Sequence, residues 1–208
     1  MDWYFDFISP YSYLQCERMP QWPEGTSIVP KPILFAALLN HWGQKGPAEI
    51  PVKRVFTYRQ VQWLAERDGI AFRFPPRHPF NPINALRLAI AAGNEMEAIR
   101  TIFRFIWRDG GEFESAEGWK ALCRQLRVED GEALVARQEV KDELRANGEQ
   151  ALAAGVFGVP TILVDGRIFW GYDATPMAHE YLVSPARFDS EEMQRVAALP
   201  VGKARVPS

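Results

Sequence analysis

The stretch that decides the fold lies toward the C-terminal end and reads Val159-Pro160-Thr161-Ile162-Leu163-Val164-Asp165-Gly166-Arg167-Ile168-Phe169-Trp170. Two apolar runs flank Asp165-Gly166, a dipeptide that favours the two-residue turn of a β-hairpin. A Thr-Pro helix start follows in residues 171–176, and a closing helix is predicted over residues 177–182. This part of the chain therefore has the order β-β-α.

The N-terminal part has a complementary pattern. In residues 2–8, Trp3, Phe5 and Phe7 recur at period two, which is typical of a strand. Ser9-Pro10 follows directly and indicates a helix start, because serine caps free N–H groups and proline fits the first turn. We predict a helix over residues 10–19 and an extended segment over residues 27–33, whose prolines indicate an edge strand or a strand end. The first 34 residues are thus β-α-β.

Between these parts the apolar period is helical for more than a hundred residues. The predicted helices cover residues 35–39, 52–68, 84–92, 95–108, 115–126 and 131–155, the last with a break near Asn147-Gly148. Four prolines in residues 73–82 exclude a helix there, and we expect this loop to line a cleft. With Val159-Pro160 directly before the third strand, the whole pattern predicts an α/β, thioredoxin-like fold with a large all-helical insertion.

The expected domains follow from this order. Residues 1–34 and 156–200 form a discontinuous thioredoxin-like domain, residues 35–155 form the helical insertion domain, and residues 201–208 form a loose C-terminal tail.

Composition narrows the function classes. The 208 residues include 24 Lys+Arg against 26 Asp+Glu, so the net charge of −2 gives no basic excess for binding nucleic acid. Apolar residues make up 47% of the chain, yet no run is long enough to span a membrane. We expect a cytoplasmic protein. The two cysteines form no C-x-x-C, and the three histidines have no metal-ligand spacing, so no metal site is indicated.

The junction after the first strand is the first candidate site. A redox thioredoxin-like protein carries C-x-x-C at this junction, but this chain has Ser9-Pro10-Tyr11-Ser12 and so cannot exchange disulfides there. Ser9 has two interpretations: it caps the helix, or its hydroxyl stabilises a thiolate or oxyanion at the helix N-terminus. Cys16 lies beyond the helix start, and we expect it to pack as a small apolar residue.

Three segments carry a family resemblance. They are residues 5–13 (Phe-Asp-Phe-Ile-Ser-Pro-Tyr-Ser-Tyr), residues 156–161 (Val-Phe-Gly-Val-Pro-Thr) and residues 169–173 (Phe-Trp-Gly-Tyr-Asp). In this order and spacing, the chain resembles the 2-hydroxychromene-2-carboxylate isomerases, glutathione-dependent relatives of kappa-class glutathione transferases in the DsbA-like thioredoxin superfamily. The resemblance covers residues 3–182.

The resemblance implies a glutathione site. Ser9 matches the family's catalytic serine, whose hydroxyl holds the glutathione sulfur as a thiolate. Val159 matches the residue whose backbone pairs with the cysteinyl amide, and Pro160 matches the family's cis-proline. Asp173 would meet the γ-glutamyl ammonium group. The full set of implied glutathione-binding residues is Ser9, Tyr11, Val159, Pro160, Trp170, Gly171, Tyr172 and Asp173.

The substrate side departs from the family. The naphthalene-pathway isomerases use a lysine and an Asn-Arg pair there, but this chain has Leu39-Asn40-His41 and Ala48-Glu49 near those places. The residues that we consider as replacements for these substrate-binding groups are Lys53, Arg54, Arg77, His78 and Asn81. Tyr11 could position an aromatic substrate or stack on it.

The resemblance therefore implies a glutathione-dependent cis-trans isomerase acting on a small aromatic-degradation intermediate. One alternative is a kappa-like glutathione transferase that forms conjugates, and another is a catalytically inactive thioredoxin-like binding module. The resemblance is also compatible with a homodimer, for which the sequence itself identifies no interface.

Overall fold

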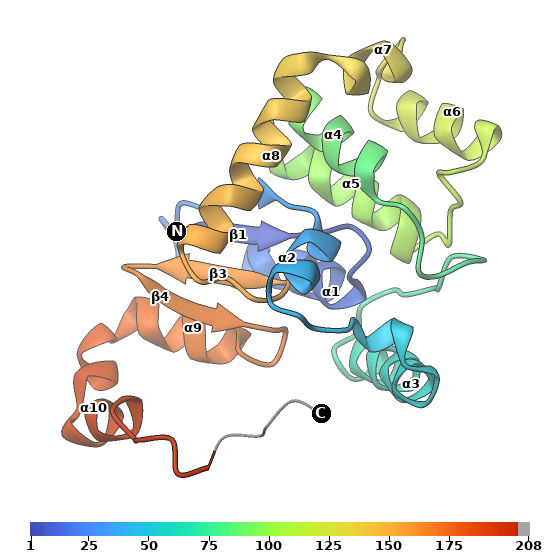
Figure 1. The fold of residues 1–208 in the computed structure, drawn as a ribbon. Helices are drawn as coiled ribbons and strands as arrows, with labels where there is room; N and C mark the ends of the chain where they lie inside the picture. Colours follow the sequence, from blue (N-terminus) through green and yellow to red (C-terminus); the bar gives the residue numbers. More distant parts are fainter. Residues whose placement is uncertain (204–208) are drawn as a thin grey trace.

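A four-stranded mixed sheet lies at the centre of the computed structural model, which describes residues 1–203 (Figure 1). The order is β2-β1-β3-β4, with β1 at Asp2–Phe5, β2 at Val29–Pro32, β3 at Thr161–Val164 and β4 at Arg167–Trp170. β2 is parallel to β1, whereas β3 is antiparallel to both β1 and β4. The predicted β-α-β and β-β-α units thus combine in one sheet, with the proline-containing β2 at an edge, as expected.

β1 is shorter than the strand predicted over residues 2–8, because Asp6 turns the chain. Its carboxylate accepts hydrogen bonds from the backbone N–H groups of Ile8 at 3.0 Å and Phe35 at 2.8 Å. Helix α1 (Pro10–Arg18) then begins directly after Ser9, as predicted, and the short helix η1 (Met19–Gln21) follows. The turn at Asp6 sets the place where α1 begins.

The hairpin of β3 and β4 has the predicted bounds. Asp165 and Gly166 have φ values of 50° and 75°, and positive φ at both central positions is what a type I′ turn requires. The register pairs Thr161 with Trp170, so Trp170 lies at the end of the hairpin farthest from the turn.

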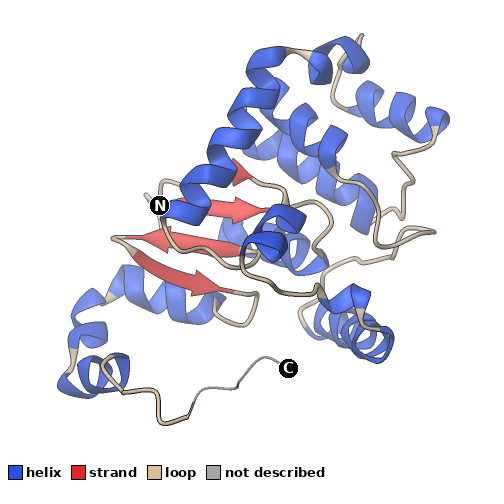
Figure 2. Ribbon diagram, viewed as in Figure 1, coloured by secondary structure: helices blue, strands red, loops and turns tan. Residues whose placement is uncertain are grey.

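The helices between β2 and β3 follow the predicted order. They are α2 (Phe35–His41), η2 (Pro47–Glu49), α3 (Pro51–Arg67), α4 (Ile83–Ala91), α5 (Met96–Trp107), α6 (Ala116–Gln125), α7 (Gly131–Ala136) and α8 (Gln138–Ala153). In the view of Figures 1 and 2, α4, α5 and α8 lie above the sheet, and α3 lies apart from them at the lower right.

The break predicted near Asn147-Gly148 is wrong. α8 runs through both residues, and the chain breaks instead at Arg137, which has extended backbone angles (φ −57°, ψ 139°) between α7 and α8. Asn147 is buried, and its side-chain amide donates a hydrogen bond of 3.3 Å to the carbonyl of Pro32 in β2. This tertiary contact offsets the low helix propensity of the Asn-Gly pair.

One buried cluster joins the sheet to the helices. Trp3 and Phe5 of β1 stack with ring centroids 4.3 Å apart, and the ring of Phe103 in α5 lies 4.5 Å from that of Phe7. The thioredoxin-like part and the helical part therefore share a core. Their division into two domains remains a prediction.

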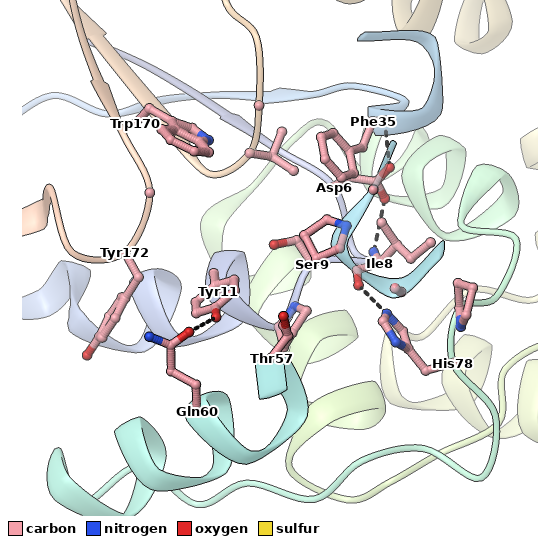
Figure 3. Close-up of a pocket in the computed structure, with 18 of the residues that line it drawn as sticks. Asp6, Ile8, Ser9, Tyr11, Phe35, Thr57, Gln60, His78, Trp170 and Tyr172 are labelled. Carbon is pink, nitrogen blue, oxygen red and sulfur yellow. Dashed lines mark hydrogen bonds between the residues drawn. The ribbon is translucent and has the colours of Figure 1, made fainter. Parts of the chain in front are cut away.

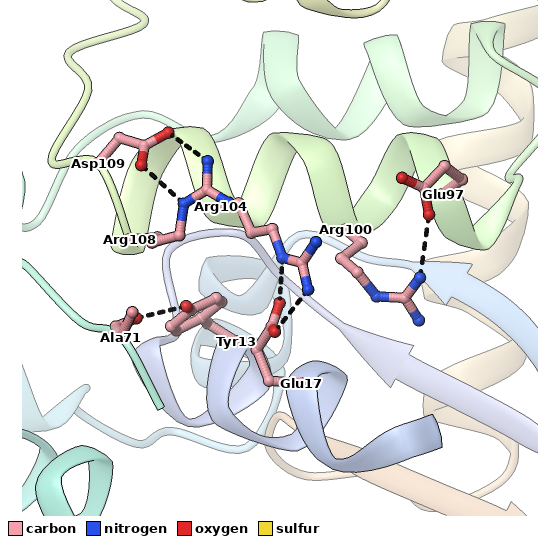
Figure 4. A network of polar contacts seen from close by, with 8 residues as sticks. All are labelled: Tyr13, Glu17, Ala71, Glu97, Arg100, Arg104, Arg108 and Asp109. Atoms are coloured by element: carbon pink, nitrogen blue, oxygen red, sulfur yellow. Dashed lines mark hydrogen bonds and ion pairs between the residues drawn. The ribbon is translucent and has the colours of Figure 1, made fainter. Parts of the chain in front are cut away.

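Polar contacts fix α1 against α5 and against the loop after α3 (Figure 4). Arg104 donates two hydrogen bonds of 2.8 Å to the carboxylate of Glu17, which is the geometry of a strong bidentate pair. The hydroxyl of Tyr13 donates a hydrogen bond of 2.6 Å to the carbonyl of Ala71. These contacts hold the helix whose N-terminus carries Ser9.

The C-terminal part contains more helix than the sequence predicted. α9 (Thr175–Val183) extends the closing helix expected over residues 177–182, and η3 (Pro185–Asp189) and α10 (Glu191–Ala197) were not predicted. Residues 201–203 of the expected tail form no helix or strand, and its remainder lies outside the described residues. Within residues 1–203, no helix combines the length and apolar character needed to cross a membrane.

Candidate functional site

A cavity of about 1230 Å³ lies between the β1–α1 junction, α2, α3, the loop over residues 73–82 and the β4–α9 turn (Figure 3). It brings together most of the residues that the sequence singled out, namely Ser9, Tyr11, Lys53, His78, Asn81, Val159, Trp170, Gly171, Tyr172 and Asp173. Arg54 and Pro160 are not part of its lining. The loop over residues 73–82 contributes its second half to the wall, in agreement with the prediction that it lines a cleft.

Ser9 lies at the N-terminus of α1, in the wall of the cavity. Its Oγ accepts a hydrogen bond of 3.2 Å from the backbone N–H of Ser12, so Ser9 is indeed the helix N-cap. Within residues 1–203, no acceptor is recorded for the hydroxyl proton of Ser9. Since capping uses the oxygen as an acceptor and leaves the proton free to be donated, the two interpretations of Ser9 are compatible.

Val159 and Trp170 form a second part of the wall. The peptide bond between Val159 and Pro160 is cis, and within residues 1–203 neither the N–H nor the C=O of Val159 has a hydrogen-bond partner. A Cβ atom on Gly158 would lie 2.3 Å from the indole Nε1 of Trp170, so a larger residue there would displace the Trp170 side chain. Pro160 is buried, and its carbonyl accepts a hydrogen bond of 2.8 Å from the backbone N–H of Gly171. The backbone of Val159 can therefore pair with an extended peptide.

The β4–α9 turn supplies a carboxylate to the cavity wall. Gly171 has a φ of +93°, and a Cβ atom there would lie 2.5 Å from the Oδ1 of Asp173, so glycine lets this carboxylate fold back over the turn. Asp173 is exposed, whereas Tyr172 is buried and donates a hydrogen bond of 2.5 Å to Asp68. An ammonium group is the natural partner of an exposed carboxylate in such a wall.

Tyr11 bridges the cavity from α1 to α3. Its hydroxyl donates a hydrogen bond of 2.8 Å to Oε1 of Gln60 (Figure 3). Burial, together with the nearby charge of Asp173, raises the pKa of Tyr11 to about 12. The side chain thus stays a neutral phenol at physiological pH and offers a ring face and a hydroxyl, but no charge.

The predicted substrate-binding residues differ in the hydrogen bonds that their side chains already make. His78 is held by both ring nitrogens, because Nε2 donates to the carbonyl of Ile8 at 2.9 Å and Nδ1 accepts from the hydroxyl of Tyr58 at 2.7 Å. Burial lowers its pKa, which keeps it neutral. The Oδ1 of Asn81 accepts a hydrogen bond of 3.1 Å from Ile83, and Lys53 is exposed. Lys53 is thus the least constrained of the three.

Apolar side chains make up a large part of the cavity wall. They include Leu34, Phe35, Leu39, Phe56, Pro79 and Phe80. Arg77, another residue considered from the sequence, pairs with Glu112 and is not part of the lining. The apolar part of the wall suits a flat apolar ring better than a highly charged ligand.

Asp6 is a residue of the cavity wall that the sequence analysis did not single out. It is fully buried, and this burial raises its pKa to about 7, although its bonds from Ile8 and Phe35 act in the opposite direction. A polar residue between Phe5 and Phe7 in a strand pattern predicts an exposed side chain. Only the turn at Asp6, which sequence does not reveal, puts it inside.

Comparisons with known proteins identify a family and relatives of this chain. The family of DsbA-like thioredoxin domains matches residues 1–183. The chain is 28% identical to glutathione S-transferase kappa 2 of Caenorhabditis elegans, over 88% of this chain and 91% of that protein. It is 29% identical to 2-hydroxychromene-2-carboxylate isomerase of Sphingobium xenophagum, over 88% of this chain and 97% of that protein.

A solved structure supports the fold. That of a 2-hydroxychromene-2-carboxylate isomerase superimposes with a TM-score of 0.77 at 22% identity, covering 90% of this chain and 96% of that one. The predicted resemblance and fold class are thereby confirmed. With its mixed sheet, its helices between β2 and β3 and a match over residues 1–183, the chain belongs to the family of DsbA-like thioredoxin domains.

Proposed function

We propose that this protein is a glutathione-dependent cis-trans isomerase of the 2-hydroxychromene-2-carboxylate isomerase type. The observation that carries the proposal is Ser9, which lies in the wall of a large cavity at the N-terminus of α1 and whose hydroxyl proton has no recorded acceptor within residues 1–203. A hydroxyl donor combined with a helix N-terminus favours a thiolate. The proposal is also supported by relatives named as this isomerase and as a glutathione S-transferase.

The residues of the cavity fit glutathione. The unpaired N–H and C=O of Val159 would hold the cysteinyl backbone, and Asp173 would hold the γ-glutamyl ammonium group. Trp170, Gly171 and Tyr172 would form the wall around the γ-glutamyl group. The buried Pro160 would fix the position of the Val159 backbone. Ser9 would donate its hydrogen bond to the sulfur.

The apolar part of the wall would hold the aromatic substrate, with Tyr11 beside it. Lys53, an exposed cation of the lining, would meet an anionic substituent, and Asn81 and His78 would form another part of the wall. Glutathione would supply the nucleophile that adds reversibly to a conjugated carbon, so that rotation changes the geometry without net redox change. Arg54 lies outside the lining and has no role in this proposal.

A kappa-like transferase is the second candidate, because one of the relatives named above is a kappa-class transferase. It would use the same thiolate and the same Ser9 but would release a conjugate. Quantifying free thiol during turnover of a hydroxychromene-type substrate separates the two activities. An isomerase leaves the glutathione concentration constant, whereas a transferase lowers it by one molecule per product.

The test of the proposal is a calorimetric titration with glutathione, run with the ultraviolet absorbance of the thiolate. We expect saturable binding and thiolate absorbance near neutral pH, and loss of the absorbance in Ser9→Ala. Ser115→Ala is the matched control, because Ser115 caps α6 through the same kind of bond to Gly118 but is not part of the cavity lining. Absence of binding at millimolar glutathione would exclude both enzymes and leave a thioredoxin-like binding module.

A further inference from the structure

Arg18 lies on the last turn of α1 and lines the same cavity as Asp173. Its Nη1 is 3.8 Å from Oδ1 of Asp68, which is an ion-pair distance but is too long for a hydrogen bond. The side chain is 38% exposed, and within residues 1–203 its guanidinium donates no recorded hydrogen bond. Arg18 is therefore a cation of the cavity wall with its donors still available.

Asp68 does not neutralise Arg18, because its carboxylate already has closer partners. Arg67 donates two hydrogen bonds of 2.8 Å to it, and Tyr172 donates a third of 2.5 Å. These bonds hold the pKa of Asp68 at about 2, so it carries its full charge at neutral pH. Two arginines thus share one carboxylate, and the cluster keeps an excess positive charge next to the cavity.

The β4–α9 turn is hydrogen-bonded to α1 close to Arg18. Gln15, one helical turn before Arg18, is fully buried, and its amide donates to the Oγ1 of Thr175 at 2.9 Å and to the carbonyl of Gly171 at 3.4 Å. Tyr172 reaches from this turn to Asp68, the partner of Arg18. The guanidinium of Arg18 and the carboxylate of Asp173 therefore belong to one end of the cavity, with Tyr172 tied between them.

We propose that Arg18 binds the free α-carboxylate of a γ-glutamyl group and so selects ligands with an intact amino-acid end. This inference rests on the proposed function and adds a specificity residue to it. An amino-acid end carries an ammonium and a carboxylate on one carbon. A cavity end with the exposed carboxylate of Asp173 and the guanidinium of Arg18, whose hydrogen-bond donors are still available, matches both charges. The planar guanidinium group can bind a carboxylate through two parallel hydrogen bonds.

The test compares two ligands and two proteins by calorimetry. One ligand is glutathione, and the other is 4-aminobutanoyl-cysteinyl-glycine, which lacks only the α-carboxylate of the γ-glutamyl group. We expect the wild-type protein to bind glutathione about 10- to 100-fold more tightly than the analogue, as for one charge-assisted bidentate contact. Arg18→Met should bind both ligands equally, with the affinity that the wild-type protein has for the analogue.

Arg59→Met is the control, since Arg59 is an exposed arginine of α3 outside the cavity lining. It should keep the full preference for glutathione. An Arg18→Met protein that keeps the preference, or that loses affinity for both ligands by the same factor, would overturn the assignment of Arg18 while leaving the glutathione site intact. Failure of the wild-type protein to bind glutathione would instead overturn the proposed function, and the inference with it.

Discussion

At the scale of single residues, Asp6 combines structural and electrostatic roles. Its carboxylate ties the loop that leads into Ser9 to the first residue of α2, through Ile8 and Phe35. No charged side chain contributes to its shifted pKa, which burial alone raises to about 7. Two backbone N–H groups thus bind the Asp6 carboxyl group, while its burial disfavours ionisation.

This shift makes stability depend on pH. The unfolded chain loses the Asp6 proton near pH 4, whereas the folded protein keeps it until about pH 7. Since the folded state then binds more protons, the free energy of unfolding should fall as pH rises from 4 to 7 and level off above that. The contribution of Asp6 is at most on the order of 4 kcal/mol.

Urea unfolding of the wild-type protein and Asp6→Asn across this pH range measures the effect. The free energy of unfolding of the wild-type protein minus that of Asp6→Asn should fall as pH rises from 4 to 7, because asparagine does not titrate. A difference that stays constant with pH would contradict the raised pKa. An infrared carbonyl band of a protonated carboxyl group at pH 5.5 gives an independent check on the wild-type protein.

Sequence identified the residues of the site where a local rule is strong. Ser9 follows from the Ser-Pro helix start, whereas Gly171 to Asp173 are implied by the family resemblance and lie in the turn that the sequence predicts after the hairpin. Asp6, Gln60 and Asp68 could not be found in this way. They reach the cavity through tertiary contacts from a turn and from α3, and no periodicity in the sequence marks such contacts.

At the scale of elements, Gly148 provides a prediction about helix α8. It lies inside the helix, and a Cβ atom there would meet nothing within 4 Å. Gly148→Ala should therefore raise the free energy of unfolding by about 0.5–1 kcal/mol, because alanine has the higher helix propensity. The midpoint of urea unfolding measures the change.

Gly166→Ala is the contrasting variant. A Cβ atom there would also meet nothing within 4 Å, but Gly166 has a φ of +75° in the hairpin turn. Its substitution should lower stability by about 1 kcal/mol through backbone strain alone. Equal effects of the two variants would contradict the assignment of Gly148 to the helix interior.

The same two glycines explain where elements could be predicted. The Asp-Gly pair at 165–166 decides its turn locally, so the hairpin bounds agree with the sequence to the residue. The Asn-Gly pair at 147–148 has a similar preference, but Asn147 is buried against β2, and this contact keeps the helix intact. Local chemistry predicts an element until a tertiary contact outweighs it.

At the scale of the whole molecule, the shared core determines how the protein unfolds. Phe7, two residues after β1, packs on Phe103 of α5, and the pair of Glu17 and Arg104 joins α1 to the same helix. Removing the helices would expose the aromatic side chains of β1. We therefore expect one cooperative unfolding transition, although the sequence predicted two domains.

Urea unfolding followed by tryptophan fluorescence and by far-ultraviolet circular dichroism should give coincident curves. Glu17→Gln should shift both curves together by about 1–2 kcal/mol, because the glutamate side chain is only 15% exposed. Asp109→Asn, which breaks an exposed pair with Arg108, should change stability by less than about 0.5 kcal/mol. If the curves separate, or if Glu17→Gln shifts only one, then the helical insertion folds independently and the shared aromatic core does not couple it to the sheet.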